Sequence, residues 1–253
     1  MTGDAGAAPP GRILYGGTFN PPHQRHVDVA LAALRLLAGR VDGVDLVPSA
    51  RPPHKPGGGI LPFALRCALV EAAIREAARE AATPEGGPLL RCNRMEGERS
   101  GPSYTWDTLT AFRAAAPGVE PYFLMGGQDY ALLPTWRRGL ELPALCRLVV
   151  APRGNVADAD AFRAVTRAHW PGAREAPPRP AAGPDAADPV PRMLLPGGGE
   201  TLLLPLPPQA VSASEIRAAW LSGHPPAALL PREVLHLLEQ HREVVTASWR
   251  ENR

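Results

Sequence analysis

The segment that most constrains the fold lies near the start of the chain, where an apolar run passes through two glycines into a helical pattern. Residues 12–15 precede Gly16 and Gly17, and apolar residues then recur at helical spacing from Val27 to Leu37. A strand, a glycine turn and a helix in this order begin a βαβ unit. The glycines let the backbone approach an anion, and the helix N-terminus offers unpaired N–H groups and a positive dipole end.

Two histidines stand where this helix begins. His23 and His26 are three residues apart, so both imidazoles fall on one helix face and can point at the same phosphate groups. A lone surface histidine is more often solvated than functional, and the chain has neither a G-x-G-x-x-G nor a P-loop sequence. The ordered combination of strand, glycines and paired histidines is much more specific, and it favours a phosphate-binding site.

Strand and helix patterns alternate along the chain. Apolar runs predict strands over residues 12–15, 44–47, 89–92, 121–125, 147–151 and 201–206, and helical periodicity predicts helices over 24–38, 61–82, 103–115, 214–222 and 232–241. This alternation predicts an α/β protein with a Rossmann-like, doubly wound parallel sheet and C-terminal helices. Ligands bind such sheets at the carboxyl ends of the strands, where residues 16–26, 52–55 and 126–129 fall.

The length of 253 residues suits one α/β domain with insertions. We expect a disordered leader over residues 1–11 and a single domain over 12–245, followed by a tail over 246–253. Prolines and three consecutive glycines between 152 and 199 predict an extended, partly mobile surface insertion, with a helix over 159–170 inside it.

Composition narrows the function classes. The net charge of +2 gives no reason to expect a nucleic acid or an anionic membrane as partner. Three cysteines without pairing spacing, no signal segment and no apolar run of 18 residues predict reduced thiols in a cytoplasmic protein. Lys55 is the only lysine in a chain rich in arginine. A tight phosphate site can distinguish a compact ammonium from a guanidinium, but chance retention explains one lysine equally well.

The segment over residues 211–217 has two interpretations. Ser212 or Ser214 can simply cap a helix that carries an outward Arg217. The same hydroxyls and backbone N–H groups can instead hold phosphates, with Arg217 on the same face. Taken alone the segment favours the cap, whereas in combination with the histidine segment it favours phosphate binding.

Several segments resemble one known family. Residues 16–26 resemble the GTFxPxHxxH signature of nucleotidyltransferases whose HxGH motif handles the triphosphate of ATP or CTP. Within that superfamily the chain is similar to bacterial-type nicotinate mononucleotide adenylyltransferases. Further matches are residues 51–55 to a PPHK loop, 101–105 to a GPSYT segment, 127–129 to a GxD segment, 134–136 to a PxW segment and 211–217 to an ISSTxIR motif. Without the family, helix caps and a half-buried aromatic would explain several of these segments.

The resemblance implies two groups of binding residues. The ATP site would comprise Gly16, Gly17, Thr18, Phe19, His23, His26, Gly127, Asp129, Ser212, Ser214 and Arg217. The pyridine nucleotide would contact Asn20, Lys55, Ser103, Tyr104, Thr105 and Trp136. His23, His26, Lys55 and Arg217 would be the catalytic residues. Mg²⁺ would arrive with ATP rather than in a metal site of the protein.

The implied reaction is adenylyl transfer from ATP to nicotinate mononucleotide, giving nicotinate adenine dinucleotide and pyrophosphate in NAD biosynthesis. The acceptor phosphate is already anionic, so direct in-line attack on the α-phosphate needs no general base. Two alternatives stay open: nicotinamide mononucleotide as acceptor, and a catalytically impaired nucleotide-binding relative. Pantetheine-phosphate adenylyltransferases share the histidine motif but are shorter and lack the segments around Thr105 and Trp136.

Three residues depart from the family pattern. Asn20 stands where bacterial-type members usually have Asp, and Arg25 replaces the glycine of HxGH. Ala213 replaces a hydroxyl residue of the C-terminal motif. Arg25 would either crowd the nucleotide or point outward.

Overall fold

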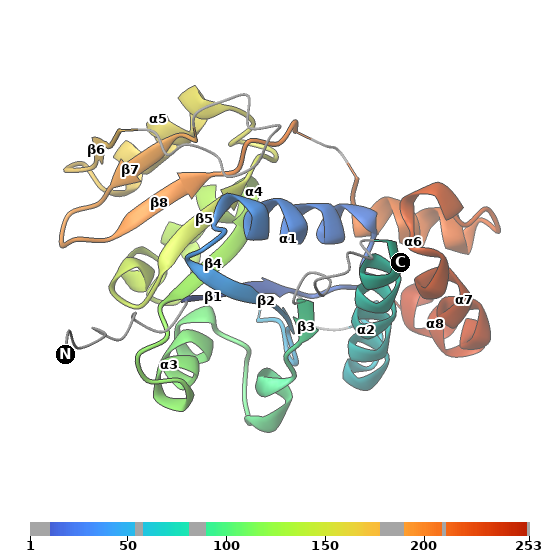
Figure 1. Cartoon of the computed structure of the whole chain (residues 1–253). Helices are drawn as coiled ribbons and strands as arrows, with labels where there is room; N and C mark the ends of the chain where they lie inside the picture. The colour runs from blue at the N-terminus through green and yellow to red at the C-terminus, as the bar shows by residue number, and fades with distance from the viewer. Residues whose placement is uncertain (1–10, 54–57, 81–89, 178–189, 209–210, 252–253) are drawn as a thin grey trace, which may run out of the picture.

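The computed structural model describes residues 11–53, 58–80, 90–177, 190–208 and 211–251. Strands and helices alternate through most of these ranges (Figure 1). The strands are β1 (Gly11–Gly17), β2 (Val41–Pro48), β3 (Leu90–Cys92), β4 (Pro121–Gly126), β5 (Arg147–Ala151), β6 (Arg174–Glu175), β7 (Arg192–Leu194) and β8 (Glu200–Leu203). The helices are α1 (Gln24–Leu36), α2 (Phe63–Glu80), α3 (Thr105–Ala115), α4 (Gly127–Ala131), α5 (Ala159–His169), α6 (Ala213–Leu221), α7 (Arg232–Gln240) and α8 (Arg242–Arg250).

The strands form one sheet in the order β3-β2-β1-β4-β5-β8-β7-β6. The first six strands in this order, β3-β2-β1-β4-β5-β8, pair in parallel. At the far edge, β7 pairs antiparallel with β8, and β6 pairs antiparallel with β7. The strand order reverses direction between β1 and β4, which creates the crevice where such sheets bind ligands. The predicted Rossmann-like nucleotidyltransferase fold with C-terminal helices is confirmed.

Alternate side chains of the strands build two apolar layers. On β1, Ile13 packs with α1, α2 and the C-terminal helices, while Leu14 packs with α3, α4 and α5 on the other face. Both side chains are fully buried. Because successive residues of a strand point to opposite faces, a continuous apolar run such as β4 serves both layers. Figure 1 shows α1 and α3 on opposite sides of the sheet.

The expectation of a surface insertion over 152–199 is wrong for its described parts. Besides the expected helix, which is α5, this segment supplies β6 and β7 to the sheet. Val190 and Met193 are fully buried, so this segment contributes to the core. Pairing with β8 overrides the local effect of the prolines, four of which lie in residues 178–189, outside the described ranges.

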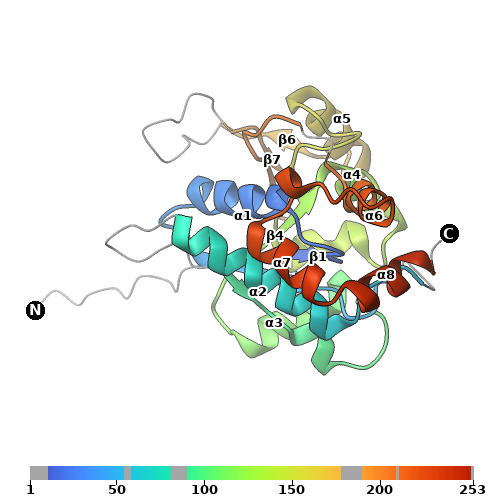
Figure 2. The same cartoon turned by 90° about the vertical axis from the view of Figure 1, so that its right-hand side faces the viewer.

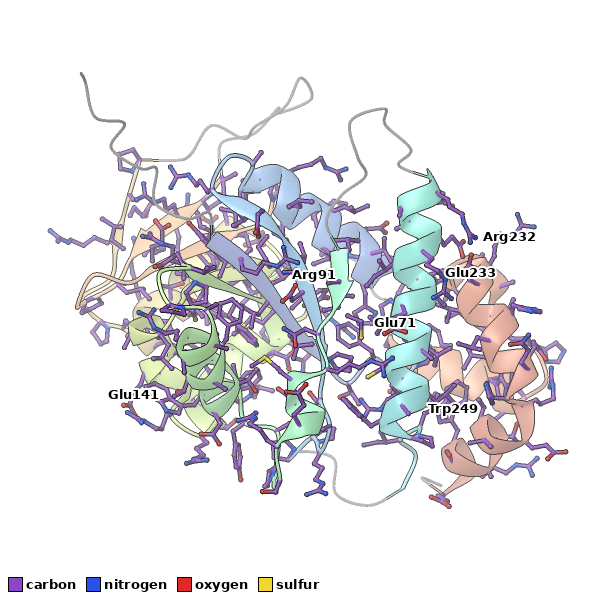
Figure 3. All side chains as sticks on the ribbon, turned by 60° about the horizontal axis from the view of Figure 1, so that its bottom comes forward. Glu71, Arg91, Glu141, Arg232, Glu233 and Trp249 are labelled. Atoms are coloured by element: carbon purple, nitrogen blue, oxygen red, sulfur yellow. The ribbon has the colours of Figure 1, made fainter. Side chains whose placement is uncertain are left out.

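The expected tail over 246–253 is also wrong for residues 246–250, which belong to α8. Val245 and Trp249 of this helix are buried, and the Trp249 indole packs edge-to-face on Trp220 of α6. The C-terminal helices lie beside α2 (Figure 2), and Glu233 stands at the junction of α7 with α2 (Figure 3). Of the expected leader, Gly11 belongs to β1 and residues 1–10 lie outside the described ranges.

The three cysteines are free; Cys67 and Cys146 are buried, and Cys92 is half-buried. No helix within the described ranges combines the length and apolar character that a membrane crossing requires.

Candidate active site

One cavity of about 370 Å³ opens at the carboxyl ends of the central strands. Its walls come from the ends of β1, β2, β4 and β5 and from the starts of α1, α3 and α6. The residues that precede these three helices, His23, Tyr104 and Ser212, all line the cavity. Three helix N-termini therefore direct unpaired N–H groups and positive dipole ends toward one space, which suits an anionic ligand.

The cavity brings together most of the predicted site residues. Those that line it are Gly16, Gly17, Thr18, Phe19, Asn20, His23, His26, Ser103, Tyr104, Thr105, Asp129, Trp136, Ser212, Ser214 and Arg217. Lys55 and its neighbour His54 lie outside the described residues.

Gly127 does not line the cavity, and the neighbouring Gly126 does. A Cβ on Gly127 would lie 2.6 Å from the carbonyl oxygen of Arg153 and 2.7 Å from Cβ of Val156. The glycine is therefore required for close packing of α4 against the turn after β5. This packing explains its place in the sequence without a contact to ligand.

The histidine pair lines the cavity at the start of α1. The Nδ1 atom of His26 accepts a hydrogen bond from the backbone N of His23 at 3.1 Å, and the two ring centroids are 3.8 Å apart. With Nδ1 used as an acceptor, the neutral His26 ring carries its proton on Nε2 and can donate from there. Nδ1 of His23 is buried and has no hydrogen-bond partner in the described part of the chain. A bound polar ligand would satisfy that atom.

Both histidines are held in the neutral form. Burial, together with the charges of Arg153 and Arg25, lowers the pKa of His23 to about 4. Burial and the neighbouring charges of His23 and Arg153 also lower the pKa of His26 below its usual range. At neutral pH the site therefore presents uncharged imidazoles, and among the described residues its positive charge comes from arginines and helix dipoles.

The low pKa of His23 predicts that the protein loses stability as the pH falls from about 6.5 to about 4. An unfolded histidine takes up a proton near pH 6.5 while buried His23 stays neutral, so the unfolded state binds more protons across this window. The interval corresponds to about 3 kcal/mol of unfolding free energy. Urea unfolding of wild type and His23→Asn from pH 7 to 4 should show a flatter dependence in the variant. His224→Asn, at an exposed histidine, should keep the wild-type dependence, and an equally steep His23→Asn profile would contradict the assignment.

At the start of α6, the residues predicted either to cap the helix or to bind phosphate take part in the cap and line the cavity as well. Oγ of Ser212 accepts a hydrogen bond from the backbone N of Glu215 at 3.2 Å, so Ser212 is the helix cap, and it lines the cavity as well. Arg217 turns back into the site, where Nη1 donates to the carbonyl oxygen of Asn20 at 2.9 Å and Nη2 to Oγ of Ser214 at 3.1 Å. Burial lowers the pKa of Arg217, but a guanidinium stays charged. Capping and phosphate binding are thus compatible here.

Asn20 has a structural role that the sequence interpretation missed. Its Nδ2 donates to the carbonyl oxygen of Gly59 at 2.6 Å, and its Oδ1 accepts from the backbone N of Leu61 at 3.0 Å and from Nε1 of Trp249 at 3.2 Å. The amide is buried, with both ends bonded to protein. The amide ties α8 and the segment before α2 to the histidine loop, and because Asn20 also lines the cavity, its contact with the pyridine nucleotide stays a prediction.

Asn20→Asp is expected to lower the free energy of unfolding by about 1–3 kcal/mol at pH 7. One carboxylate oxygen would face the carbonyl oxygen of Gly59, which now accepts from Nδ2. Denaturant titration of wild type and variant measures the difference. The difference should shrink toward pH 4, where a protonated carboxyl group can donate to Gly59. An Asn20→Asp protein as stable as wild type at pH 7 would contradict this role.

The opposite end of the cavity is aromatic. Tyr104 and Trp136 line it together with Thr105, the first residue of α3. Ser103 holds this end to the loop after β2, because its Oγ accepts from the backbone N of Arg51 at 3.0 Å. Flat rings beside a helix N-terminus suit a heteroaromatic ligand that carries an anionic group.

Three arginines in the site carried no predicted role. Arg153 lines the cavity just after the end of β5. Because ligands bind at the carboxyl ends of parallel strands, its position after a predicted strand could have indicated it. Arg137 lines the aromatic end, directly after Trp136. Arg25 lines the cavity too, and its Nη2 donates to the carbonyl oxygen of Pro207 at 2.8 Å, so the side chain binds the segment before α6.

The fold and the cavity together define a Rossmann-like nucleotidyltransferase. The sequence profile of the cytidylyltransferase-like family matches residues 14–219. Probable nicotinate-nucleotide adenylyltransferases from Pseudomonas paraeruginosa and Citrifermentans bemidjiense are 34% and 31% identical to this chain. These alignments cover 90% and 92% of the chain, and 94% and 98% of the two relatives. The chain belongs to the cytidylyltransferase-like family and, within it, to the nicotinate-nucleotide adenylyltransferases.

Other similar proteins align with a smaller part of the chain or at lower sequence identity. A probable nicotinate-nucleotide adenylyltransferase from Trichlorobacter lovleyi is 41% identical over 140 residues, which span 55% of this chain and 60% of that relative. Among solved structures, the Plasmodium falciparum nicotinic acid mononucleotide adenylyltransferase complexed with NaAD aligns with a TM-score of 0.64 at 13% identity. It covers 93% of this chain and 97% of that structure's chain. At this identity the structural likeness shows the shared fold alone.

Proposed function

We propose that this protein transfers the adenylyl group of ATP to nicotinate mononucleotide, forming nicotinate adenine dinucleotide and pyrophosphate. The observation that carries the proposal is that one cavity joins the His23–His26 and Ser212–Arg217 end to the Tyr104–Trp136 end. The first end suits the triphosphate, and the second suits the pyridine ring. The family relatives carry the same activity in their names, which supports the proposal.

In this proposal the chemistry is direct displacement at the α-phosphate. An oxygen of the acceptor phosphate attacks the α-phosphorus, and the bond to the β-phosphate oxygen breaks as pyrophosphate leaves. Nε2–H of His26 donates to the oxygens on which charge develops, and the Nδ1 atom of His23, which has no partner among the described residues, forms a hydrogen bond with the bound nucleotide. Arg217 and the N-termini of α1 and α6 offset the charge of the leaving pyrophosphate. Catalysis then rests on positioning and charge stabilisation.

Mg²⁺ belongs to the proposal as the companion of ATP. When bound, it neutralises charge on the phosphate oxygens and orients them. In the described residues no group of three or more His, Cys, Asp or Glu side chains is placed to hold a metal ion. The donor set of the cavity consists mainly of imidazole, hydroxyl and guanidinium groups, with carboxylates from Glu96 and Asp129, and it fits a metal bound through the phosphates of the substrate. Lys55 as a further phosphate ligand and a cytoplasmic location remain predictions.

The test is product formation by the full chain. Purified protein is incubated with ATP, Mg²⁺ and either nicotinate or nicotinamide mononucleotide, and the products are resolved by mass. Dinucleotide formed mainly from the acid is the expected result. Preference for the amide would identify nicotinamide mononucleotide as the acceptor. ATP binding with no dinucleotide formed from either acceptor would indicate a nucleotide-binding relative without this activity.

A further inference from the structure

Arg137 brings a positive charge to the aromatic end of the cavity. It directly follows Trp136, and its side chain lines the same space as Tyr104 and Thr105. The guanidinium carbon lies 4.9 Å from the centre of the Tyr104 ring, and Nη1 donates to Oδ2 of Asp107 at 2.7 Å. A ring contact and an ion pair therefore hold the guanidinium beside the first turn of α3.

This position combines two sources of attraction for an anion. A guanidinium has five N–H donors in a planar fork that matches a carboxylate, and the bond to Asp107 uses one of them. Thr105 begins α3, so the unpaired N–H groups of the helix N-terminus face the same end of the cavity. Asp107 lies in that first turn and fixes the fork without lining the cavity.

An amide in the same place would interact less well. Its oxygen is uncharged, and its NH₂ group is a donor that finds only further donors on the guanidinium. The site would thus favour a pyridine ring bearing a carboxylate over one bearing a carboxamide.

We infer that Arg137 is a specificity-determining residue, which selects nicotinate mononucleotide over nicotinamide mononucleotide by binding the pyridine carboxylate. The inference rests on the proposed function and adds the residue that sets its acceptor preference.

The adjacent residue provides a matched control. Arg138 has its guanidinium carbon 3.5 Å from the centre of the Trp106 ring, and its Nη2 donates to Oε2 of Glu141 at 2.6 Å. It does not line the cavity. Arg138→Gln therefore removes an arginine with the same kinds of contact, one position along the chain, without removing charge from the site.

The experiment compares kcat/KM for the two acceptors at saturating ATP and Mg²⁺ in wild type, Arg137→Gln, Arg137→Lys and Arg138→Gln. Arg137→Gln should lower kcat/KM for the acid about 10-fold or more and change that for the amide less than about threefold. Arg137→Lys should recover part of the preference, because an ammonium supplies charge but no planar fork. Arg138→Gln should keep the wild-type ratio.

The acid-to-amide ratio separates selectivity from a structural role. An equal fall for both acceptors in Arg137→Gln, or an unchanged ratio, would overturn the inference while the proposed function stands. Wild type that prefers the amide would overturn it as well. Wild type that forms dinucleotide from neither acceptor would remove the proposed function and the inference together.

Discussion

His26→Ala is expected to lower kcat/KM for dinucleotide formation by at least about 100-fold, the size of effect that one lost charge-stabilising donor produces. The half-buried imidazole lines the cavity, and its Nδ1 atom accepts a hydrogen bond from the backbone N–H of His23. The proton on Nε2 is therefore available for the oxygens of the α-phosphate. A water molecule that replaced the imidazole in the alanine variant would lack the fixed orientation of this N–H donor.

The variant should remain folded, which separates a catalytic loss from a structural one. It loses the hydrogen bond from the backbone N of His23, a cost of about 1 kcal/mol. Circular dichroism and a thermal melt check the fold, and steady-state kinetics measure the loss. His236→Ala, at an exposed histidine on α7, should leave kcat/KM unchanged. Near-wild-type turnover by a folded His26→Ala protein would overturn the role given to His26.

Arg66→Ala is expected to lower the free energy of unfolding by about 3 kcal/mol or more. Arg66 lies on α2 with 1% of its surface exposed. Its Nε, Nη1 and Nη2 atoms donate to the carbonyl oxygens of Leu61, Thr18 and Ala50 at 2.9, 2.8 and 3.4 Å. Thr18 lies in the loop between β1 and α1, and Ala50 and Leu61 lie near the two ends of the connection between β2 and α2. Alanine would therefore leave buried acceptors without donors and loosen the loop that leads to the histidines.

Urea denaturation at neutral pH measures this effect, and kcat/KM for the acceptor reports on the loop. Arg75→Ala is the matched control, because Arg75 lies on the same helix but is more than half exposed and pairs with Glu233. Its loss should cost about 1 kcal/mol or less. Arg66→Lys should restore only part of the stability, since one ammonium cannot reach three carbonyls in the same geometry. A loss no larger in Arg66→Ala than in Arg75→Ala would contradict this account.

The helices and central strands could be predicted because their patterns are local. Apolar spacing from Val27 onward predicts α1, and the continuous apolar run of β4 predicts a strand buried on both faces. The order of these elements predicts the parallel sheet, and the rule on strand ends then predicts where the site lies. The missed elements are those whose pattern is short or polar, such as β6, β7 and α8, and which depend on neighbours for their stability.

The type of chemistry could be inferred from one segment of the sequence, because the glycines before α1, the N-cap His23 and His26 three residues later are placed by local backbone geometry. How each group is used depends on the packing of the whole molecule. This packing brought the N-termini of α1, α3 and α6 to one cavity, and it satisfied both ends of the Asn20 amide with residues as distant as Trp249. It also set the neutral state of His23 and placed Arg137 on the cavity wall. Burial and contacts between residues far apart in the chain are properties of the packed molecule, so no pattern within a segment contains them.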